Sequence, residues 1–333
     1  MNRRKVYYLF FSGKNCNPTY LIKAYLREYT PKCFVRPFLS QELRKLDERT
    51  DKDYILQRVD YYNKLTPESP IDATQWTEEA IALEEQPITR QKVYYFDAME
   101  IARYFNQKLK WILLPGDITH IPELPTIVKS RPLGEHNENS VILKLVKNRH
   151  FLFVNDKKSW RKKKNAAIFR GDLGPRKEIR DVFMNRFATG QSPLVDAAST
   201  NCLEKHPEWQ KGKLTIGEHL DYKFIMSLEG NDVASNLKWI MSSNSIAVST
   251  RLTCETWFME GTLIPNYHYI EVKEDFSDLE ERLTYYLEHP KEAETIIQHA
   301  HEYVNQFKDK KREKLIGLLT LKKYFEITNH TAL

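Results

Sequence analysis

The sequence WRKKKNAAIFRG, residues 160–171, decides the fold that we expect for this chain. A basic run leads into a short apolar strand, which ends on Arg170 and Gly171 before a turn with Gly174 and Pro175. In open α/β sheets, ligands bind beyond the carboxyl ends of the strands. A guanidinium beside a glycine at that place suits a ligand that carries phosphate. The same residues are also compatible with a solvated basic surface followed by an ordinary edge strand.

Alternating strands and helices on both sides of this stretch predict a doubly wound α/β protein. Residues 277–280 read Ser-Asp-Leu-Glu, a capping box that predicts a helix start, and Pro290 predicts the start of the next helix. The polar residues 131–140 are predicted to form part of the linker between two Rossmann-like halves, with the boundary between 130 and 160. Strands are predicted at residues 6–11, 111–114, 166–169, 224–228, 245–248 and 267–272, and helices at 51–65, 96–109 and 234–241.

Length and composition are typical of a two-domain globular protein. The chain has 333 residues, of which 41% are hydrophobic and 29% are charged, and a usual domain has about 150 residues. No apolar run approaches the roughly 18 residues of a transmembrane helix. The apolar run at residues 6–11 is short for a signal-peptide core, and the last residues carry no retrieval signal. We therefore expect a cytoplasmic protein.

The cysteine positions and the charge of the chain indicate which kinds of ligand the protein could bind. Cys16, Cys33, Cys202 and Cys254 are scattered, which predicts reduced thiols and does not favour a zinc site. The net charge is +6, with basic clusters at residues 157–164 and 308–314. Such clusters attract nucleic acid, phosphate-rich ligands or anionic lipid headgroups. Because most charge runs are simply solvated faces, charge alone does not choose among these.

Asp117 is the first candidate for chemistry. It follows the predicted strand at residues 111–114 and the turn Pro115-Gly116. A carboxylate at that place would project from the carboxyl edge of a sheet into a cleft. The alternative is a turn-forming aspartate that bonds its own backbone.

A second candidate site follows the predicted strand at residues 224–228, where Gly230 lies in a turn before a predicted helix. A new helix offers free N–H groups and the positive end of its dipole to a diphosphate. Ser235, Asn236 and Lys238 would add side-chain donors. An ordinary capped helix explains the same pattern.

Carboxylates and one histidine form a third group. Glu255 and Glu260 do not share a helix face, so one could hold a pair of ribose or sugar hydroxyls while the other caps or faces solvent. A lone strand histidine such as His268 is more often structural than catalytic. Residues 51–53 read Asp-Lys-Asp, which resembles a metal-binding Asp-x-Asp, but they open a charged helix and we reject them as a metal site.

Taken in order, these segments resemble glycosyltransferase family 90, which includes capsule-associated proteins, lipopolysaccharide-core glycosyltransferases and protein O-glucosyltransferases. The resemblance covers roughly residues 110 to 310, and the order and spacing of its segments are jointly specific. The segments are Gly116-Asp117, Trp160 with residues 162–165, Phe169-Arg170-Gly171, Tyr222-Lys223-Phe224, Glu229-Gly230, Ser245, Pro265, residues 268–272 and residues 277–279.

The resemblance implies a GT-B-type fold with two Rossmann-like domains that face a central cleft. We expect an acceptor-side domain at residues 1–150, a nucleotide-sugar-binding domain at 151–310 and a helical tail at 311–333. The implied reaction is inverting and needs neither metal nor cofactor. It moves a hexose from a UDP-sugar, with Asp117 as the base. Donor contacts are expected from Arg170, Gly171, Lys223, Gly230, Ser235, Asn236, Lys238, Glu255 and Glu260.

One departure from the family concerns the diphosphate. Eukaryotic members carry a phosphate-facing arginine where this chain has Asn236-Leu237-Lys238. The contact is then expected to pass to Asn236, Lys238 or backbone N–H groups. We also expect Asp117 and Arg170 to face each other across the cleft between the domains.

The expected acceptor is the lipopolysaccharide core or a related envelope glycan, reached by peripheral contact with the inner face of the cytoplasmic membrane. Two other classes stay open. One is a nucleic-acid-binding protein that uses the basic clusters, although no helix-turn-helix, RNP or zinc pattern is present, so we expect no nucleic acid as partner. The other is a family member that binds sugar without catalysis.

Overall fold

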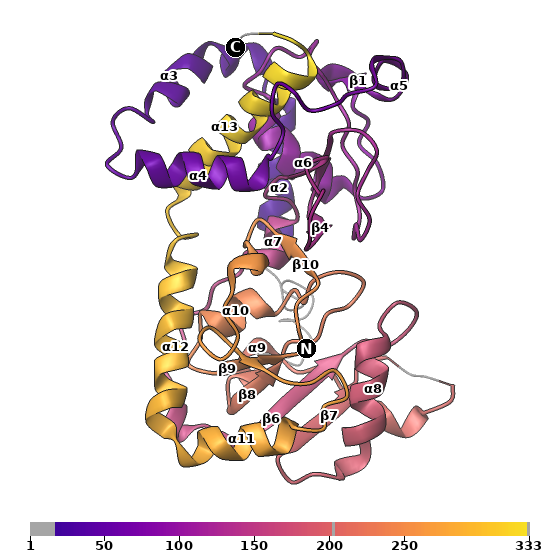
Figure 1. The fold of residues 1–333 in the computed structure, drawn as a ribbon, viewed down its shortest axis with the longest axis vertical. Coiled ribbons are helices and arrows are strands. Elements are labelled where there is room, and N and C mark those ends of the chain that lie inside the picture. Colours follow the sequence, from indigo (N-terminus) through magenta and orange to yellow (C-terminus); the bar gives the residue numbers. More distant parts are fainter. Residues whose placement is uncertain (1–16, 202–203, 332–333) are drawn as a thin grey trace. The chain divides into compact units, whose positions relative to one another are not determined.

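The computed structural model describes residues 17–201 and 204–331, which form two compact units (Figure 1). The first, which we call the sheet unit, contains the segments Asn148–Thr253 and Met259–Gln306. The second, which we call the helical unit, contains Asn17–Lys147, Cys254–Phe258 and Phe307–Leu333. Each unit is therefore built from segments that lie far apart in the sequence. The strand predicted at residues 6–11, together with Cys16 and Cys202, lies outside the described residues.

A five-stranded parallel sheet forms the centre of the sheet unit, which confirms the mixed α/β class. Its strands lie in the order β7-β6-β8-β9-β11. Their bounds are Lys164–Gly171 for β6, Val195–Ser199 for β7, Tyr222–Met226 for β8, Ile246–Ser249 for β9 and Ile270–Glu271 for β11. The edge strand β7 was not predicted, because its sequence VDAAS carries little apolar or β-branched signal.

Both faces of this sheet are buried, as expected for parallel strands with helices on either side. Phe169 and Phe224 point to one face, where they join a cluster with Phe183 and Phe276. The alternating residues Ile168, Ile225 and Ala247 are also buried, and strand periodicity places them on the opposite face. Burial on both faces explains why these strands read as short apolar runs rather than as alternating patterns.

Helices connect and cover the strands of the sheet unit (Figure 1). The helices are α7 (Lys147–His150), α8 (Glu178–Phe187), α9 (Ile216–His219), α10 (Leu237–Met241), α11 (Leu279–Glu288) and α12 (Pro290–Asn305). Pro290 opens α12, as predicted. The capping box predicted at residues 277–280 is wrong. Helix α11 begins at Leu279, and its N-cap residue Asp278 instead accepts a hydrogen bond from the N–H of Lys273.

The helical unit differs from the Rossmann-like half predicted for residues 1–150. Its described strands form only small pairs: β1 (Ile81–Ala82) with β2 (Lys110–Trp111), β3 (Thr126–Val128) with β5 (Ser140–Ile142), and β4 (Ser130–Pro132) with β10 (Cys254–Thr256). These strands have two or three residues each, at or below the short end of the usual range. The helices are α2 (Asn17–Tyr29), α3 (Leu39–Arg44), α4 (Lys52–Tyr62), α5 (Ala73–Glu79), α6 (Lys92–Ala102) and α13 (Lys310–Thr328).

Helix α13 supplies much of the core of the helical unit, where it packs against α4 and α6. Its Tyr324 is fully buried and donates a hydrogen bond to the carbonyl of Pro125 at 2.8 Å. Its Glu313 is buried too and pairs with Arg58 at 2.6 Å and Lys144 at 2.7 Å. The last helix of the chain therefore fixes the segments that carry Asp117.

Candidate functional site

The order of the strands locates the candidate site in the sheet unit. In chain order the strands lie as 2-1-3-4-5, so the direction of winding reverses between β6 and β8. Ligands of such sheets bind outside the carboxyl ends of the strands at this switch point. A cavity of about 480 Å³ lies there, lined at the end of β6 by Arg170 and Gly171 and at the end of β8 by Met226. Arg149, Arg180 and Lys213 also line this cavity, which we call the switch-point pocket.

Arg170 is held firmly in the wall of the switch-point pocket. Its guanidinium donates to the Asp196 carboxylate at 2.8 Å and to the Phe169 carbonyl at 2.7 Å. Burial of Asp196 works against ionisation, yet the hydrogen bond from Arg170 keeps the pKa of that carboxyl below its usual range. The buried Nε of Arg170 has no hydrogen-bond partner within the described residues. An orphaned buried donor in a pocket wall calls for an acceptor, which a bound ligand or an ordered water would supply.

Gly171 follows Arg170 and is required by close approach. A Cβ at this position would lie 2.6 Å from the ring of Phe169, which belongs to the buried core. Only glycine therefore lets the strand end this close to the aromatic side chain. The sequence placed Arg170 and Gly171 together, and the structure puts both in the pocket.

Arg180 joins the loops that follow β6 and β8. It lies on α8 and donates to the carbonyls of Asp172, Leu228 and Glu229 at 2.9 to 3.0 Å. The predicted donor residue Gly230 lies against this guanidinium. A Cβ added at position 230 would lie 3.0 Å from Nη2 of Arg180. Burial lowers the pKa of Arg180 and the like charge of Arg149 adds to this, while Asp172 opposes both. An anionic ligand would relieve this crowding of positive charge.

Arg149 and Lys213 complete the positive lining, and the sequence analysis missed both. Arg149 lies on α7 and is exposed, and no hydrogen bond or ion pair holds its guanidinium within the described part of the chain. Lys213 is exposed and lies before α9. No local motif marks either residue, because only the fold brings them to the same edge as Arg170.

Ser235 and Asn236, two of the predicted donor contacts, also line the switch-point pocket. The amide of Asn236 is already engaged, because it donates to the Met226 carbonyl at 3.0 Å and accepts from Ser227 at 3.2 Å. This side chain therefore ties the loop to the end of β8.

Five predicted donor contacts do not line this pocket: Gly230, Lys223, Lys238, Glu255 and Glu260. Lys223 is 7% exposed and stacks its ammonium 4.1 Å from the centre of the Trp160 ring. Lys238 is fully buried and forms an ion pair with Glu260, which is 2% exposed. Glu255 belongs to the helical unit, where Arg131 donates to it at 2.8 Å and Tyr61 also donates to it. These contacts give each side chain a structural role.

Asp117 lies in the helical unit, directly after a strand end. The backbone of residues 112–114 pairs in parallel with β3, through a bridge between Leu113 and Ile127. Gly116 then turns the chain with φ of +127°, a conformation that side chains with a Cβ rarely adopt. Asp117 keeps 30% of its side chain exposed and accepts a hydrogen bond from Lys129 at 2.5 Å. The carboxylate therefore projects at the carboxyl end of paired strands, as predicted.

His268 has a structural role, which agrees with the interpretation from the sequence. Its Nδ1 accepts a hydrogen bond from the backbone N–H of Ile264 at 2.9 Å. Burial lowers its pKa to about 4, so the ring stays neutral near pH 7. A neutral ring that accepts from the backbone fixes the loop before β11.

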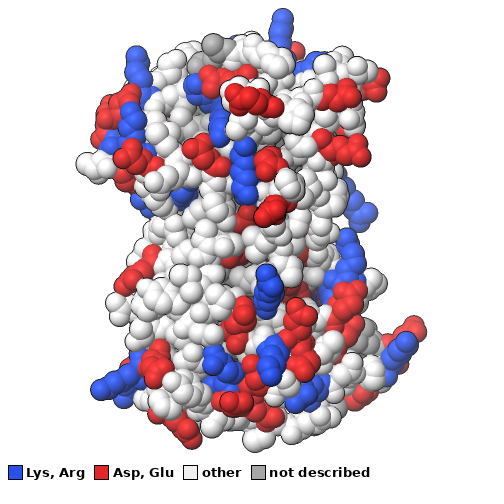
Figure 2. Space-filling view, viewed as in Figure 1, with Lys and Arg blue, Asp and Glu red and all other residues white. Residues whose placement is uncertain are grey.

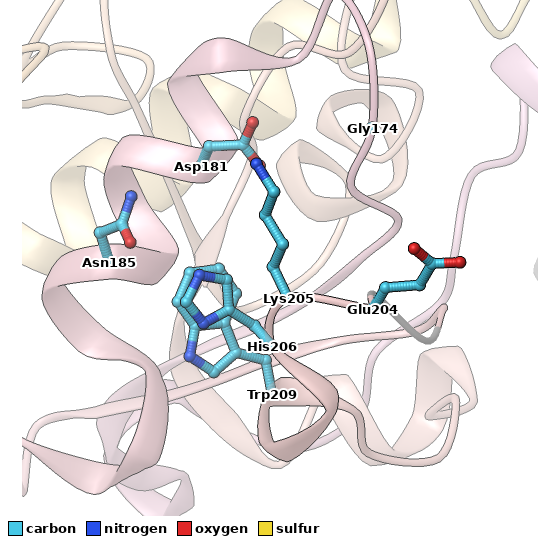
Figure 3. A pocket seen from close by; sticks show the side chains of 7 residues that line it. All are labelled: Gly174, Asp181, Asn185, Glu204, Lys205, His206 and Trp209. Carbon is cyan, nitrogen blue, oxygen red and sulfur yellow. The ribbon is translucent and has the colours of Figure 1, made fainter.

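A second cavity, of about 590 Å³, is less suited to phosphate (Figure 3). Its lining includes the carboxylates of Asp181 and Glu204, with Lys205 as its lysine. The rings of His206 and Trp209 lie face to face in it, with centres 3.9 Å apart. Two carboxylates against one ammonium would not attract a diphosphate. The smaller switch-point pocket is therefore the better candidate site.

Several side chains of the two basic clusters pair with nearby carboxylates. In the cluster at residues 157–164, Lys158 pairs with Asp221 and Lys163 with Asp156. On the face that Figure 2 shows, lysine and arginine side chains are mixed with aspartate and glutamate. A nucleic-acid-binding surface would instead gather positive charge on one face or stripe. The structure therefore does not favour the nucleic-acid alternative.

No group of three or more His, Cys, Asp or Glu side chains among residues 17–201 and 204–331 is arranged to hold a metal ion. No helix in the same part of the chain is long and apolar enough to cross a bilayer.

A cationic pocket at the switch point of a parallel sheet is typical of α/β proteins that bind a phosphorylated ligand. The model of "Glycosyl transferase family 90" matches residues 142–314. The chain is 38% identical over 273 residues to the O-glucosyltransferase LpsA of Dichelobacter nodosus, which is 82% of this chain and 83% of that protein. The chain belongs to glycosyl transferase family 90, and the protein is a glycosyltransferase.

Two eukaryotic relatives match shorter segments. Protein O-glucosyltransferase 2 of Danio rerio is 29% identical over 143 residues, which are 41% of this chain and 28% of that protein. Protein O-glucosyltransferase 1 of Rattus norvegicus is 26% identical over 158 residues, which are 44% of this chain and 38% of that protein. The resemblance read from the sequence is thus confirmed at the level of the family.

Proposed function

We propose that this glycosyltransferase moves a hexose from a UDP-sugar to a lipopolysaccharide-core or related envelope glycan, with inversion at the anomeric carbon and without a metal ion. The observation that carries the proposal is the switch-point pocket, where Arg149, Arg170, Arg180 and Lys213 share one lining. Asp172 is the acidic residue of that lining, so positive charge is in excess. A nucleoside diphosphate matches this excess charge.

In the proposed reaction, the oxygen of an acceptor hydroxyl forms a bond to the anomeric carbon of the sugar. The bond from that carbon to the diphosphate oxygen breaks, and its electron pair leaves with the nucleoside diphosphate. Asp117 accepts the hydroxyl proton as the new bond forms, because a neutral hydroxyl is a poor nucleophile. The guanidinium groups of the pocket stabilise the charge that develops on the leaving diphosphate.

The proposal includes a GT-B-type arrangement, in which Asp117 of the helical unit and Arg170 of the sheet unit face a common cleft. Family membership supports this arrangement. Each residue lies at the carboxyl end of a strand in its own unit. A closed cleft would exclude water, which competes with the acceptor hydroxyl.

The names of the relatives favour glucose as the hexose. Each of the three relatives described above is called an O-glucosyltransferase. We propose a cytoplasmic location, with peripheral contact at the inner membrane face through exposed basic side chains. The lipopolysaccharide-core acceptor rests on the resemblance to bacterial members of the family.

Purified protein incubated with UDP-glucose and truncated core oligosaccharides is expected to add the mass of one hexose to the oligosaccharide. UDP-galactose and GDP-mannose are tested as alternative donors in separate reactions. Mass spectrometry reports the transfer, and NMR of the product reports the anomeric configuration. A product that retains the donor configuration would contradict inversion. Nucleotide binding without transfer or donor hydrolysis would favour the non-catalytic alternative.

EDTA is expected to leave the transfer rate nearly unchanged. The reason is that guanidinium and ammonium groups supply the positive charge at the leaving diphosphate, in the place where other transferases use Mg²⁺. The initial rate is measured with and without EDTA after extensive dialysis. Strong inhibition that Mg²⁺ or Mn²⁺ reverses would contradict the metal-free mechanism.

A further inference from the structure

Lys129, which the sequence analysis did not single out, lies beneath the carboxylate of Asp117. It separates β3 from β4 and is 2% exposed, and its Nζ is 2.5 Å from Oδ1 of Asp117. Asp117 itself keeps 30% of its side chain open to solvent. The ion pair therefore has one enclosed end and one open end.

The backbone fixes this pair from two directions. Ile127 exchanges hydrogen bonds with Ile112 and Leu114 at 2.8 and 3.0 Å, so the strand before Asp117 and the strand before Lys129 run side by side. Ser130, which follows Lys129, is fully buried and donates a hydrogen bond from its hydroxyl to the carbonyl of Ile118 at 3.3 Å. Lys129 and Ser130 thus hold the side chain of Asp117 and the backbone that follows it.

A neighbouring ion pair in the same unit shows what a closed structural pair looks like. Arg131 lies two residues after Lys129, is fully buried, and pairs with Glu255, which is 2% exposed. Both members of that pair are enclosed, so no carboxylate oxygen is open to a substrate. The Lys129–Asp117 pair differs because a desolvated ammonium supports a carboxylate that faces outward.

We propose that Lys129 is a positioning residue for the base, which rests on the proposed function of Asp117. The ammonium holds one carboxylate oxygen in place, so that the other is aimed at the acceptor hydroxyl. It also favours the ionised carboxylate that can accept a proton. After the transfer, the proton on Asp117 passes to water, and Lys129 keeps its own proton throughout.

The test compares Lys129→Ala with Lys144→Ala, since Lys144 is another lysine of the helical unit paired with a buried glutamate, Glu313. We expect Lys129→Ala to lower kcat about 10- to 100-fold, as a misplaced reacting group does, with the KM for the donor changed by less than about twofold. Ethylammonium chloride is expected to restore part of kcat in Lys129→Ala. Lys144→Ala is expected to lose stability without this loss of kcat or this rescue.

Thermal melting and the UDP affinity of each variant establish that the compared proteins are folded. If Lys129→Ala does not fold, Lys129→Met replaces it, because methionine keeps a long apolar side chain without a donor or a charge. A folded neutral variant with kcat within about twofold of the parent would overturn the proposal. So would a loss of rate that only follows the lost folded fraction. An active Asp117→Asn variant would instead show that Asp117 is not the base. That result would contradict the proposed function, and so it is distinguishable from failure of the inference about Lys129 alone.

Discussion

Replacing Asp117 by Asn is expected to abolish measurable sugar transfer while leaving nucleotide affinity nearly intact. The amide has almost the shape of the carboxylate but cannot accept the proton of the acceptor hydroxyl. Loss of a general base typically costs about 10²- to 10⁴-fold in rate. The donor pocket belongs to the sheet unit, whereas Asp117 belongs to the helical unit, so donor binding should not depend on this carboxylate. Initial transfer rates and calorimetric titration with UDP measure the two effects separately.

Asp53→Asn is the matched control for this experiment. Asp53 lies in the same unit on α4, is exposed, and belongs to the Asp-Lys-Asp triplet that we rejected as a metal site. Its variant should transfer sugar at the parent rate. Near-normal turnover of Asp117→Asn would remove Asp117 from its role, and a large loss in Asp53→Asn would reopen the rejected site.

Removing Arg170 is expected to give the second large effect, a weaker affinity for the donor nucleotide. A hydrogen bond to a charged group contributes about 1.5–3 kcal/mol, which corresponds to roughly 10- to 150-fold in Kd. The partner carboxylate of Arg170 is not left alone in Arg170→Ala. Tyr222 still donates to Asp196 at 3.0 Å, and Lys211 lies at 3.4 Å from it. The fold should therefore survive the substitution.

Arg149→Ala is the companion variant, because no structural contact of this guanidinium within the described residues has to be broken. Its exposure reduces the expected effect to about 1 kcal/mol, or roughly fivefold in Kd. Arg161→Ala, an exposed arginine of the same unit that pairs with Glu294, is the control. Calorimetry with UDP and with the UDP-sugar measures all three. Unchanged donor affinity in Arg170→Ala would leave that residue as scaffold only.

Local sequence patterns predicted much of the sheet unit. The apolar run that ends in Arg170-Gly171 became strand β6, and the run at residues 224–228 became the central strand β8 beside it. Pro290 marked a helix start, because its fixed φ suits the first turn of a helix. These features depend on residues close in sequence, which is why they are readable without a structure.

Other features were decided by contacts between distant segments. Strand β7 has a weak pattern of its own and exists because five of its residues pair with β6. The residues Lys238 and Glu260 read as donor contacts but neutralise each other in the interior. A sequence pattern cannot distinguish a lysine aimed at a ligand from one enclosed with a carboxylate, because both need the same residue type.

The sequence by itself determined the family, the parallel α/β core and the two strand ends that carry Asp117 and Arg170. The tertiary structure alone decided which cations share the pocket with Arg170, since Arg149 and Lys213 come from segments that carry no motif. It alone placed Lys129 under Asp117, through the pairing of residues 112–114 with β3. The physical reason is the distance along the chain over which each effect acts. Strand and turn propensities act over a few residues, whereas electrostatic fields and desolvation depend on whatever the folded chain brings within a few ångströms.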